Sequence, residues 1–227
     1  MFIPASTLKR RYLVKGRFYR IKYQSQNIIR CRSTLEIFVR QNHVQSSFEP
    51  DAYVIMENPG GSESLEVTAG HIDGPIYLST DVNLASQIER TPLTNAKPDR
   101  TQYQIMRLMS NYNWNHVRVL NLSDIRTTSS TDLIETYMEL GDHHLSVFSD
   151  VRNSERSLKL QVSANKPVIA AWGTSEGLRH LAGMALSKLP DNVKGLQGNK
   201  PYKFLHPLPK YGKPRQWLED FINEVSF

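Results

Sequence analysis

A short apolar segment that ends abruptly constrains the fold of this chain more than any other feature. Residues 52–56, AYVIM, form an unbroken hydrophobic run, and the Asn58-Pro59-Gly60-Gly61 segment that follows cannot continue a strand. Such a run is typical of a strand buried on both faces of a sheet. Groups just beyond the carboxyl ends of parallel strands line the ligand crevice in open α/β sheets. The sequence therefore places Glu57 and Asn58 at a candidate site.

Three further apolar segments follow the same pattern, at residues 117–122, 167–172 and 202–205. Strands that alternate with helices favour an α/β fold, a three-layer α/β/α sandwich around a central four-stranded parallel sheet. The four strands would then end at one edge, which brings together Asn58, Asn121, Trp172-Gly173 and His206. Apolar residues at helical spacing and capping signals predict helices at residues 100–112, 132–140, 154–162, 178–189 and 217–225.

The first 50 residues indicate a basic N-terminal arm that packs on a main domain of residues 51–227. Residues 9–22 are rich in Lys, Arg and Tyr and alternate as an exposed strand would, and residues 28–32 suggest a second short strand. Ser33 followed by Glu36 matches a capping box and predicts a short helix. Residues 60–98 show no sustained period, which is typical of a functional loop or of structure that the pattern does not reveal.

Composition narrows the classes of function. The formal charge of +6 and the pI near 9.4 favour a polyanionic partner, although many basic proteins bind none. A single cysteine, Cys31, excludes an intramolecular disulfide, a cysteine-based zinc site and an iron–sulfur cluster. The sequence has no apolar stretch long enough to span a bilayer. We therefore expect a cytoplasmic protein with no membrane partner, no metal and no cofactor.

Two asparagines, a histidine and a glycine-rich turn suit one kind of chemistry. An asparagine amide offers both a donor and an acceptor, so it can read the edge of a heterocycle or hold a water. A neutral histidine can donate to an oxygen on which negative charge develops. Such a site favours cleavage of a bond to a leaving group that departs as an anion. Acyl transfer is disfavoured because no Ser or Cys lies in a nucleophile elbow.

Taken in order, these residues resemble the motifs of the uracil-DNA glycosylase superfamily. Asn58-Pro59-Gly60 is similar to the motif that positions water, in the asparagine form of the mismatch-specific and thymine glycosylases. The pattern is most similar to a phage and bacterial family of unassigned function within that superfamily, and it covers residue 51 to the C-terminus. The other matching segments are Asp99-Arg100-Thr101, Asn121-Leu122 with Arg126-Thr127, Ala171-Trp172-Gly173 and His206-Pro207-Leu208.

The resemblance implies a DNA glycosylase that flips out a modified or mismatched base and hydrolyses its N-glycosidic bond, in DNA repair or phage defence. It implies that Asn58 and His206 are catalytic, with Asn58 placing the water and His206 contacting the departing base. Base binding would fall to Asn121, which reads the base edge, with Glu57, Gly60 and Gly61 beside it. The implied DNA contacts come from Leu208, Lys210, Lys213, Arg215, Arg126 and Ser62.

Two departures from the superfamily pattern affect the expected mechanism. Asn58 stands where the most active members carry an aspartate, and an amide cannot act as a general base. The proton acceptor would then be Glu57 or Asp124, or hydrolysis would depend on expulsion of the base. Gly60-Gly61 replaces the aromatic residue that stacks under the base, so a larger or modified base could fit.

Simpler interpretations remain open for each residue. Asn58 before Pro59-Gly60 is also typical of a turn. Asn121 at a strand end could hydrogen-bond to the following backbone, and His206 could be a structural histidine. Two other functions use the same pocket: a catalytically inactive module that binds nucleic acid or a nucleotide, and a nucleoside or nucleotide hydrolase.

Overall fold

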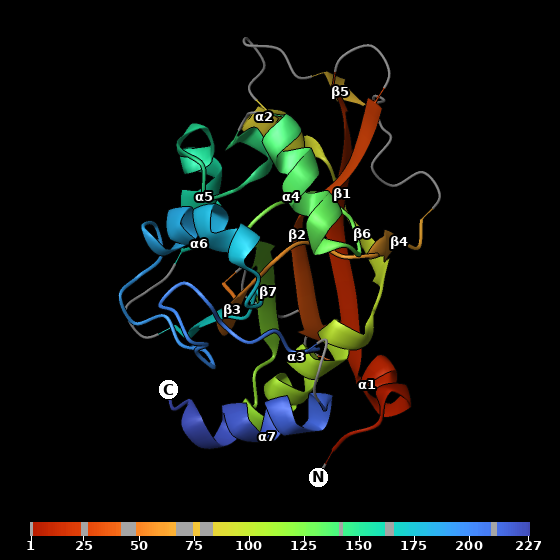
Figure 1. Cartoon of the computed structure of the whole chain (residues 1–227). Coiled ribbons are helices and arrows are strands. Elements are labelled where there is room, and N and C mark those ends of the chain that lie inside the picture. Colours follow the sequence, from red (N-terminus) through yellow and green to blue (C-terminus); the bar gives the residue numbers. More distant parts are fainter. Residues whose placement is uncertain are drawn as a thin grey trace.

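A mixed sheet forms the centre of the computed structural model, which describes residues 2–23, 27–41, 49–66, 75–77, 84–140, 143–161, 166–209 and 213–227. The sheet has eight strands within these residues, in the order β4-β6-β1-β2-β7-β3-β8, with β5 beside β1 (Figure 1). The predicted α/β class is confirmed. The strands are β1 (Tyr12–Tyr23), β2 (Asn27–Val39), β3 (Ala52–Met56), β4 (Glu63–Ser64), β5 (Ile76–Tyr77), β6 (Leu93–Lys97), β7 (His116–Asn121) and β8 (Val168–Ala170).

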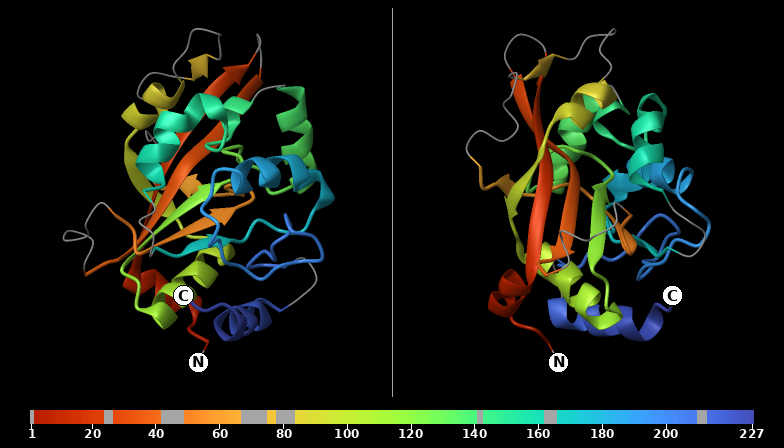
Figure 2. Two further views of the ribbon diagram at one scale, coloured as in Figure 1. Left: turned by 90° about the vertical axis from the view of Figure 1, so that its left-hand side faces the viewer. Right: turned by 180° about the vertical axis from the view of Figure 1, so that it is seen from behind.

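Helices cover both faces of the sheet, because strand side chains alternate between the faces and each face needs its own cover (Figure 2). One core joins Tyr53 and Ile55 of β3 to α2, α4 and α6. The other joins Val54 of β3 to α1, α3 and α7. The helices are α1 (Ala5–Arg11), α2 (Leu84–Arg90), α3 (Arg100–Tyr112), α4 (Ser130–Glu139), α5 (Asn153–Lys159), α6 (Arg179–Leu186) and α7 (Pro214–Glu224).

Three strands form the parallel half of the sheet. β3 lies between β7 and β8 and runs parallel to both, with Met56 opposite Asn121 and Ile55 opposite Ala170. All five residues of β3 are buried, as the apolar run predicted. The helix predicted at residues 100–112 is α3, with the same bounds, and Asp99 caps its first turn by accepting from the Gln102 backbone nitrogen at 2.8 Å.

The expected fourth parallel strand, residues 202–205, makes isolated antiparallel bridges instead. Phe204 pairs with Gly173, just beyond the end of β8, and with Gln197. The Gly173 backbone nitrogen donates to the Phe204 oxygen at 2.7 Å, and the Trp172 indole donates to the Tyr202 oxygen at 2.8 Å. These bonds hold the segment across the end of β8 rather than alongside the strand. His206 therefore still reaches the edge of the sheet where the parallel strands end.

The first 50 residues contribute two long strands to the middle of the sheet, where the sequence indicated an arm with short strands. β1 pairs antiparallel with β2, and β2 pairs antiparallel with β7. The helix predicted at Ser33 is wrong, because residues 33–36 belong to β2. Leu35 pairs with Gly16 on one side and Val119 on the other, and this tertiary pairing outweighs the local capping signal.

Part of the stretch at residues 60–98 also extends the sheet. β6 pairs antiparallel with β1 and with β4, and α2 packs Leu84 and Ile88 into the first core.

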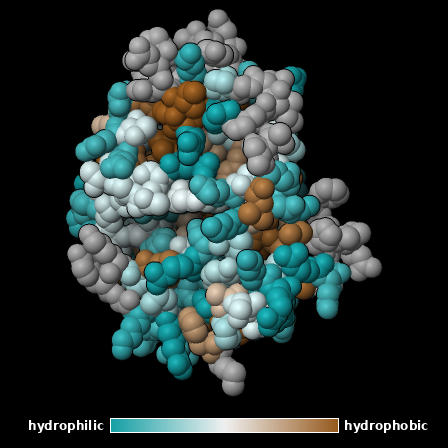
Figure 3. All heavy atoms as spheres, turned by 90° about the vertical axis from the view of Figure 1, so that its right-hand side faces the viewer, coloured by the Kyte–Doolittle hydropathy of each residue, from teal (hydrophilic) through white to brown (hydrophobic). Residues whose placement is uncertain are grey.

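On the face drawn in Figure 3, hydrophilic side chains predominate and hydrophobic ones form a few separate patches. None of the helices in the described part of the chain is both long and apolar enough to cross a bilayer.

Candidate active site

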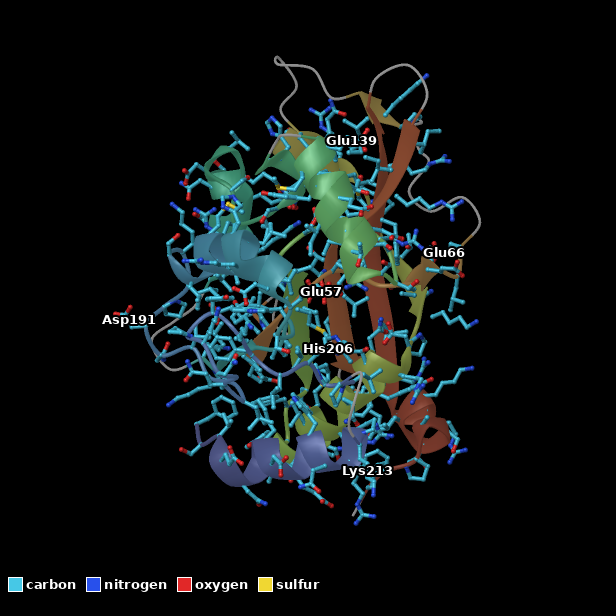
Figure 4. All side chains as sticks on the ribbon, in the orientation of Figure 1. Glu57, Glu66, Glu139, Asp191, His206 and Lys213 are labelled. Atoms are coloured by element: carbon cyan, nitrogen blue, oxygen red, sulfur yellow. The ribbon has the colours of Figure 1, made fainter. Side chains whose placement is uncertain are left out.

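A cleft of about 1120 Å³ opens where the parallel strands end, between the N-termini of α3 and α4. Glu57, Asn58 and the Gly60-Gly61 turn line it from the end of β3, and His206 lines it from the opposite end of the chain. Glu57 and His206 lie in the central part of the molecule in Figure 4. Asn58 and His206, which the sequence expected to meet, therefore share one cavity. Its apolar lining residues include Leu35, Met56, Ile105 and Val119.

The Asn58 side chain is held by the backbone of the segment after β7. Its Nδ2 donates to the Thr127 oxygen at 2.6 Å and to the Ile125 oxygen at 3.3 Å. Both amide hydrogens are therefore used within the protein, and Oδ1 is the atom that remains to orient a water. Gly60 follows with φ of +60°, a left-handed conformation that favours glycine, so the turn interpretation and the functional one both apply here.

We expect Asn58→Asp to destabilise the protein by about 2 kcal/mol, because each hydrogen bond contributes about 1 kcal/mol and a carboxylate would face two carbonyl oxygens. Thermal unfolding near neutral pH measures the loss. The superfamily resemblance alone would instead predict that Asn58→Asp raises activity, because the most active members carry an aspartate at this position. Asn95→Asp on β6, whose amide bonds to the Glu66 side chain at an exposed position, is the matched control. An Asn58→Asp protein with wild-type stability would contradict these bonds.

Among the described residues, two carboxylates line the cleft, Glu57 and Asp99, and Asp99 Oδ1 already accepts from the Gln102 backbone nitrogen. Glu57 is the other. Burial raises its pKa above the ordinary value, and the nearby Ser130 hydroxyl partly opposes the shift. Its Oε1 is buried and has no hydrogen-bond partner among the described residues. The other carboxylate considered, Asp124, is fully buried outside the cleft and is bonded to Tyr19 and Arg152 at 2.7 Å each. Of the two carboxylates that the sequence offered as proton acceptor, Glu57 is therefore the one that lines the cleft.

The His206 ring is oriented by the loop that follows it. Its Nδ1 lies 3.1 Å from both the backbone nitrogen and the oxygen of Leu208. The Leu208 N–H can donate to Nδ1 in the tautomer that carries the ring proton on Nε2, and the Leu208 oxygen can accept from Nδ1 in the other tautomer. Burial lowers the pKa of His206, while the Leu208 backbone and Asp99 oppose the shift. A neutral imidazole with its proton on Nε2 is a donor for an oxygen that gains negative charge.

Asn121 is fully buried and does not line the cleft, although the sequence expected it to read the base. In the amide orientation that satisfies both side-chain atoms, the Asn121 amide nitrogen donates to the Asn58 backbone oxygen at 3.2 Å. The Asn121 amide oxygen accepts from the Arg32 guanidinium, also at 3.2 Å. Asn121 therefore holds the Asn58 backbone by a hydrogen bond and does not face the cleft.

The residues expected to contact DNA are spread over the surface. Leu208 lines the cleft, whereas Lys213 is exposed at the start of α7, where Figure 4 labels it. Arg215 is also exposed and pairs with Glu219 at 2.9 Å. Arg126 is half-buried, with its guanidinium 5.3 Å from the Phe18 ring centre. Ser62 is buried, with its hydroxyl unpartnered among the described residues. Lys210 lies outside the described residues.

Sequence reasoning gave no site role to several polar residues that line the cleft, among them Arg32, Arg100 and Gln102. Arg32 lies on β2, in a stretch with strand periodicity that carried no site signal. Arg100 and Gln102 belong to the first turn of α3, whose Asp99 cap was the available clue. Among the described residues, no group of three or more His, Cys, Asp or Glu side chains is placed to hold a metal ion.

Comparison with known proteins identifies a family. A family model described as a protein of unknown function, DUF1643, matches residues 91–208, slightly more than half of the chain. The chain belongs to the DUF1643 family. No curated protein and no solved structure matches it.

Only some of the residues that line the cleft lie within the segment that matches the DUF1643 model. The matched segment contains α3 with Gln102, the bonding partners of Asn58 on the segment after β7, and His206. Glu57, Asn58 and Arg32 precede it. The DUF1643 segment therefore supplies the walls made by α3, α4 and the His206 loop, while β2 and β3 supply the buried arginine and the carboxylate.

Proposed function

We propose that the chain is a base-excising hydrolase of the uracil-DNA glycosylase type, with that superfamily's three-layer sandwich as its fold. One observation carries the proposal: Glu57, Asn58 and His206, from distant parts of the chain, line a single cleft at the carboxyl ends of parallel strands. A carboxylate with a raised pKa, an amide oxygen and a neutral imidazole are the groups that hydrolysis of a bond to an anionic leaving group requires.

The proposed reaction replaces the N-glycosidic bond with a bond to water. The base departs with the bonding electron pair, and His206 Nε2–H donates to the base oxygen that gains the charge. Asn58 Oδ1 orients a water toward the sugar carbon. Glu57 takes the water's proton as the new C–O bond forms, and the base anion is later protonated by solvent.

Positive charge supports DNA as the substrate. Arg100 is exposed at the N-terminus of α3 and lines the cleft, where it can meet a phosphate beside an inserted nucleotide. Arg126, Lys213 and Arg215 would contact the backbone farther away. Flipping the nucleotide costs a few kcal/mol, less for a damaged or mispaired base.

The test is formation of abasic sites in labelled DNA that carries uracil, mismatches or modified pyrimidines. We expect strand cleavage after alkali with wild-type protein, and turnover lowered about 10²- to 10³-fold by His206→Ala, the usual cost of removing one oxyanion donor. His180→Ala on the exposed face of α6 is the matched control. If His206→Ala weakened DNA binding and left turnover unchanged, the assigned role would be wrong.

Two other outcomes would replace this function. Salt-dependent DNA binding without abasic sites across the whole panel would indicate a binding module that has lost catalysis. Release of bases from free nucleosides without affinity for DNA would indicate a small-molecule hydrolase.

A further inference from the structure

Arg32 is a buried cation in the cleft, and it forms no ion pair with the described residues. Its residue is 2% exposed, it lines the cleft, and its Nε has no hydrogen-bond partner in the described part of the chain. Its bond to the Asn121 amide oxygen, at 3.2 Å, is to a neutral group. Burial lowers the pKa of Arg32 to about 10. Arg126 adds to the shift, whereas Asp99 and Asp124 oppose it, and the side chain stays protonated at neutral pH. A buried charge of this kind favours an anion.

Gln102, in the first turn of α3, offers a second unused group in the same cleft. It is 3% exposed and lines the cleft, and neither its Nε2 nor its Oε1 has a partner among the described residues. Buried amides are normally paired, because an unpaired donor and acceptor cost free energy of folding. A buried amide without a partner, in the same cleft as a guanidinium that forms no ion pair with the described residues, indicates a site whose partner is a ligand.

The surroundings of these groups are apolar. Leu35, Ile105 and Val119 are each at most 1% exposed and line the same cleft. Apolar side chains of this kind contact the faces of a flat ring, while polar groups placed around them bond to its edge.

We propose that Arg32 and Gln102 form a subsite that holds a planar heterocycle by an edge carrying delocalised negative charge. Arg32 would then be a further catalytic residue, one that stabilises the departing base as an anion. This assignment rests on the proposed hydrolysis, and it gives the base-reading role expected of Asn121 to Gln102.

A phosphate shares the chemistry of an oxyanion but fits these groups less well. A guanidinium and an amide N–H both donate, and a phosphate can accept from both. The Gln102 Oε1, however, needs a donor, which a ring N–H supplies and an ionised phosphate does not. The apolar lining also favours a ring over a strongly hydrated dianion.

His206 and Arg32 would act on the base together. His206 Nε2–H gives one neutral hydrogen bond, and Arg32 adds a full positive charge in a site shielded from water. A charge-assisted bond is stronger than a neutral one and strengthens further as the base becomes anionic. The arrangement therefore favours the transition state over the bound substrate.

Direct binding tests this inference without catalysis. The probes are barbiturate, which is an anionic pyrimidine at neutral pH, uracil, which is its neutral counterpart, and inorganic phosphate. We expect calorimetry on the full chain to show barbiturate binding at least tenfold tighter than uracil, with no competition from phosphate. Arg32→Gln should abolish this preference, and Arg90→Gln, at an exposed position on α2, should keep it.

Gln102→Leu keeps the test decisive if Arg32→Gln fails to fold. It removes only amide atoms without partners, so the melting temperature should stay the same or rise, while both pyrimidines should bind about tenfold more weakly. A structural role would instead lower the melting temperature and leave binding unchanged, which would refute the assignment.

Two further results separate this inference from the proposed function. Equal affinity of wild-type protein for barbiturate and uracil, or displacement of barbiturate by phosphate, would overturn the subsite. Charge-selective binding of the ring that depends on Arg32, in a protein that forms no abasic sites, would leave the subsite in place and overturn the hydrolase.

Discussion

Glu57→Gln is expected to slow turnover of labelled DNA by about 10²- to 10⁴-fold, the usual contribution of a positioned general base. Glutamine has the size of glutamate but cannot accept the proton of the attacking water. Burial raises the pKa of Glu57, and a base acts in its ionised form, so the wild-type rate should rise with pH and level off above that raised pKa. Single-turnover rates across a pH series measure both effects, and the variant's profile should lose this step.

The stability of the wild-type fold should fall with rising pH, whereas its rate of turnover should rise. Between the ordinary carboxyl pKa and the raised pKa of Glu57, the unfolded chain has lost the proton and the folded chain keeps it. The stability of the wild type therefore falls as pH rises through this window, and that of Glu57→Gln does not. The variant should melt higher than the wild type at neutral pH and at the same temperature below the ordinary pKa.

Glu139→Gln, an exposed substitution at the end of α4, is the control and should change neither activity nor stability (Figure 4). If Glu57→Gln lost both activity and stability at neutral pH, Glu57 would be a structural residue, and the proton acceptor would have to be sought elsewhere.

The parts of the fold that the sequence predicted are those in which local pattern and tertiary packing agree. β3 is buried on both faces, so its apolar run is continuous, and α3 has a cap and helical spacing that identify its bounds. The prediction at Ser33 to Glu36 failed because a capping box is a local signal. Pairing of β2 with strands on both sides, one of them far along the chain, decided its structure.

The same distinction applies to the site. Asn58 and His206 were predictable as neighbours because strand-end residues gather at one edge, even though His206 arrives by an antiparallel bridge at Phe204. Arg32 was not predictable. Its place in the proposed subsite depends on burial without an ion pair among the described residues, and burial of a charged residue inside a strand leaves no trace in residue order.

Arg152→Met is expected to lower the free energy of unfolding by about 3–5 kcal/mol, the usual loss when one member of a buried ion pair is removed. Arg152 is 1% exposed and donates to Asp124 at 2.7 Å and to both Glu155 oxygens at 2.7 Å. Without it, two buried carboxylates lack their main counter-charge. Denaturant unfolding measures the loss, and Lys188→Met, which breaks an exposed pair with Asp150, should cost under about 1 kcal/mol.

Acid should reduce this difference between Arg152→Met and the wild type. Burial alone would raise the pKa of Glu155, but Arg152 and Lys159 lower it to about 2. The stability from this pairing is present above the ordinary carboxyl pKa and is lost as pH falls toward 2. In the variant, Glu155 is protonated more easily, so the gap in stability should narrow over that interval. A gap that is independent of pH would mean that lost packing, rather than lost charge, destabilises the variant.

The effect of Arg152→Met should also reach the cleft. The Asp124 backbone oxygen accepts from the Arg32 backbone nitrogen at 2.9 Å, and the neighbouring Ile125 backbone oxygen accepts from Asn58 Nδ2. A displaced Asp124 would shift both residues, so the folded variant should bind barbiturate more weakly. Adding Asp124→Asn removes one of the stranded charges, and we expect the double variant to recover part of the stability. If the double variant were less stable than the sum of the two single losses predicts, Asp124 would not depend on Arg152 for its charge balance.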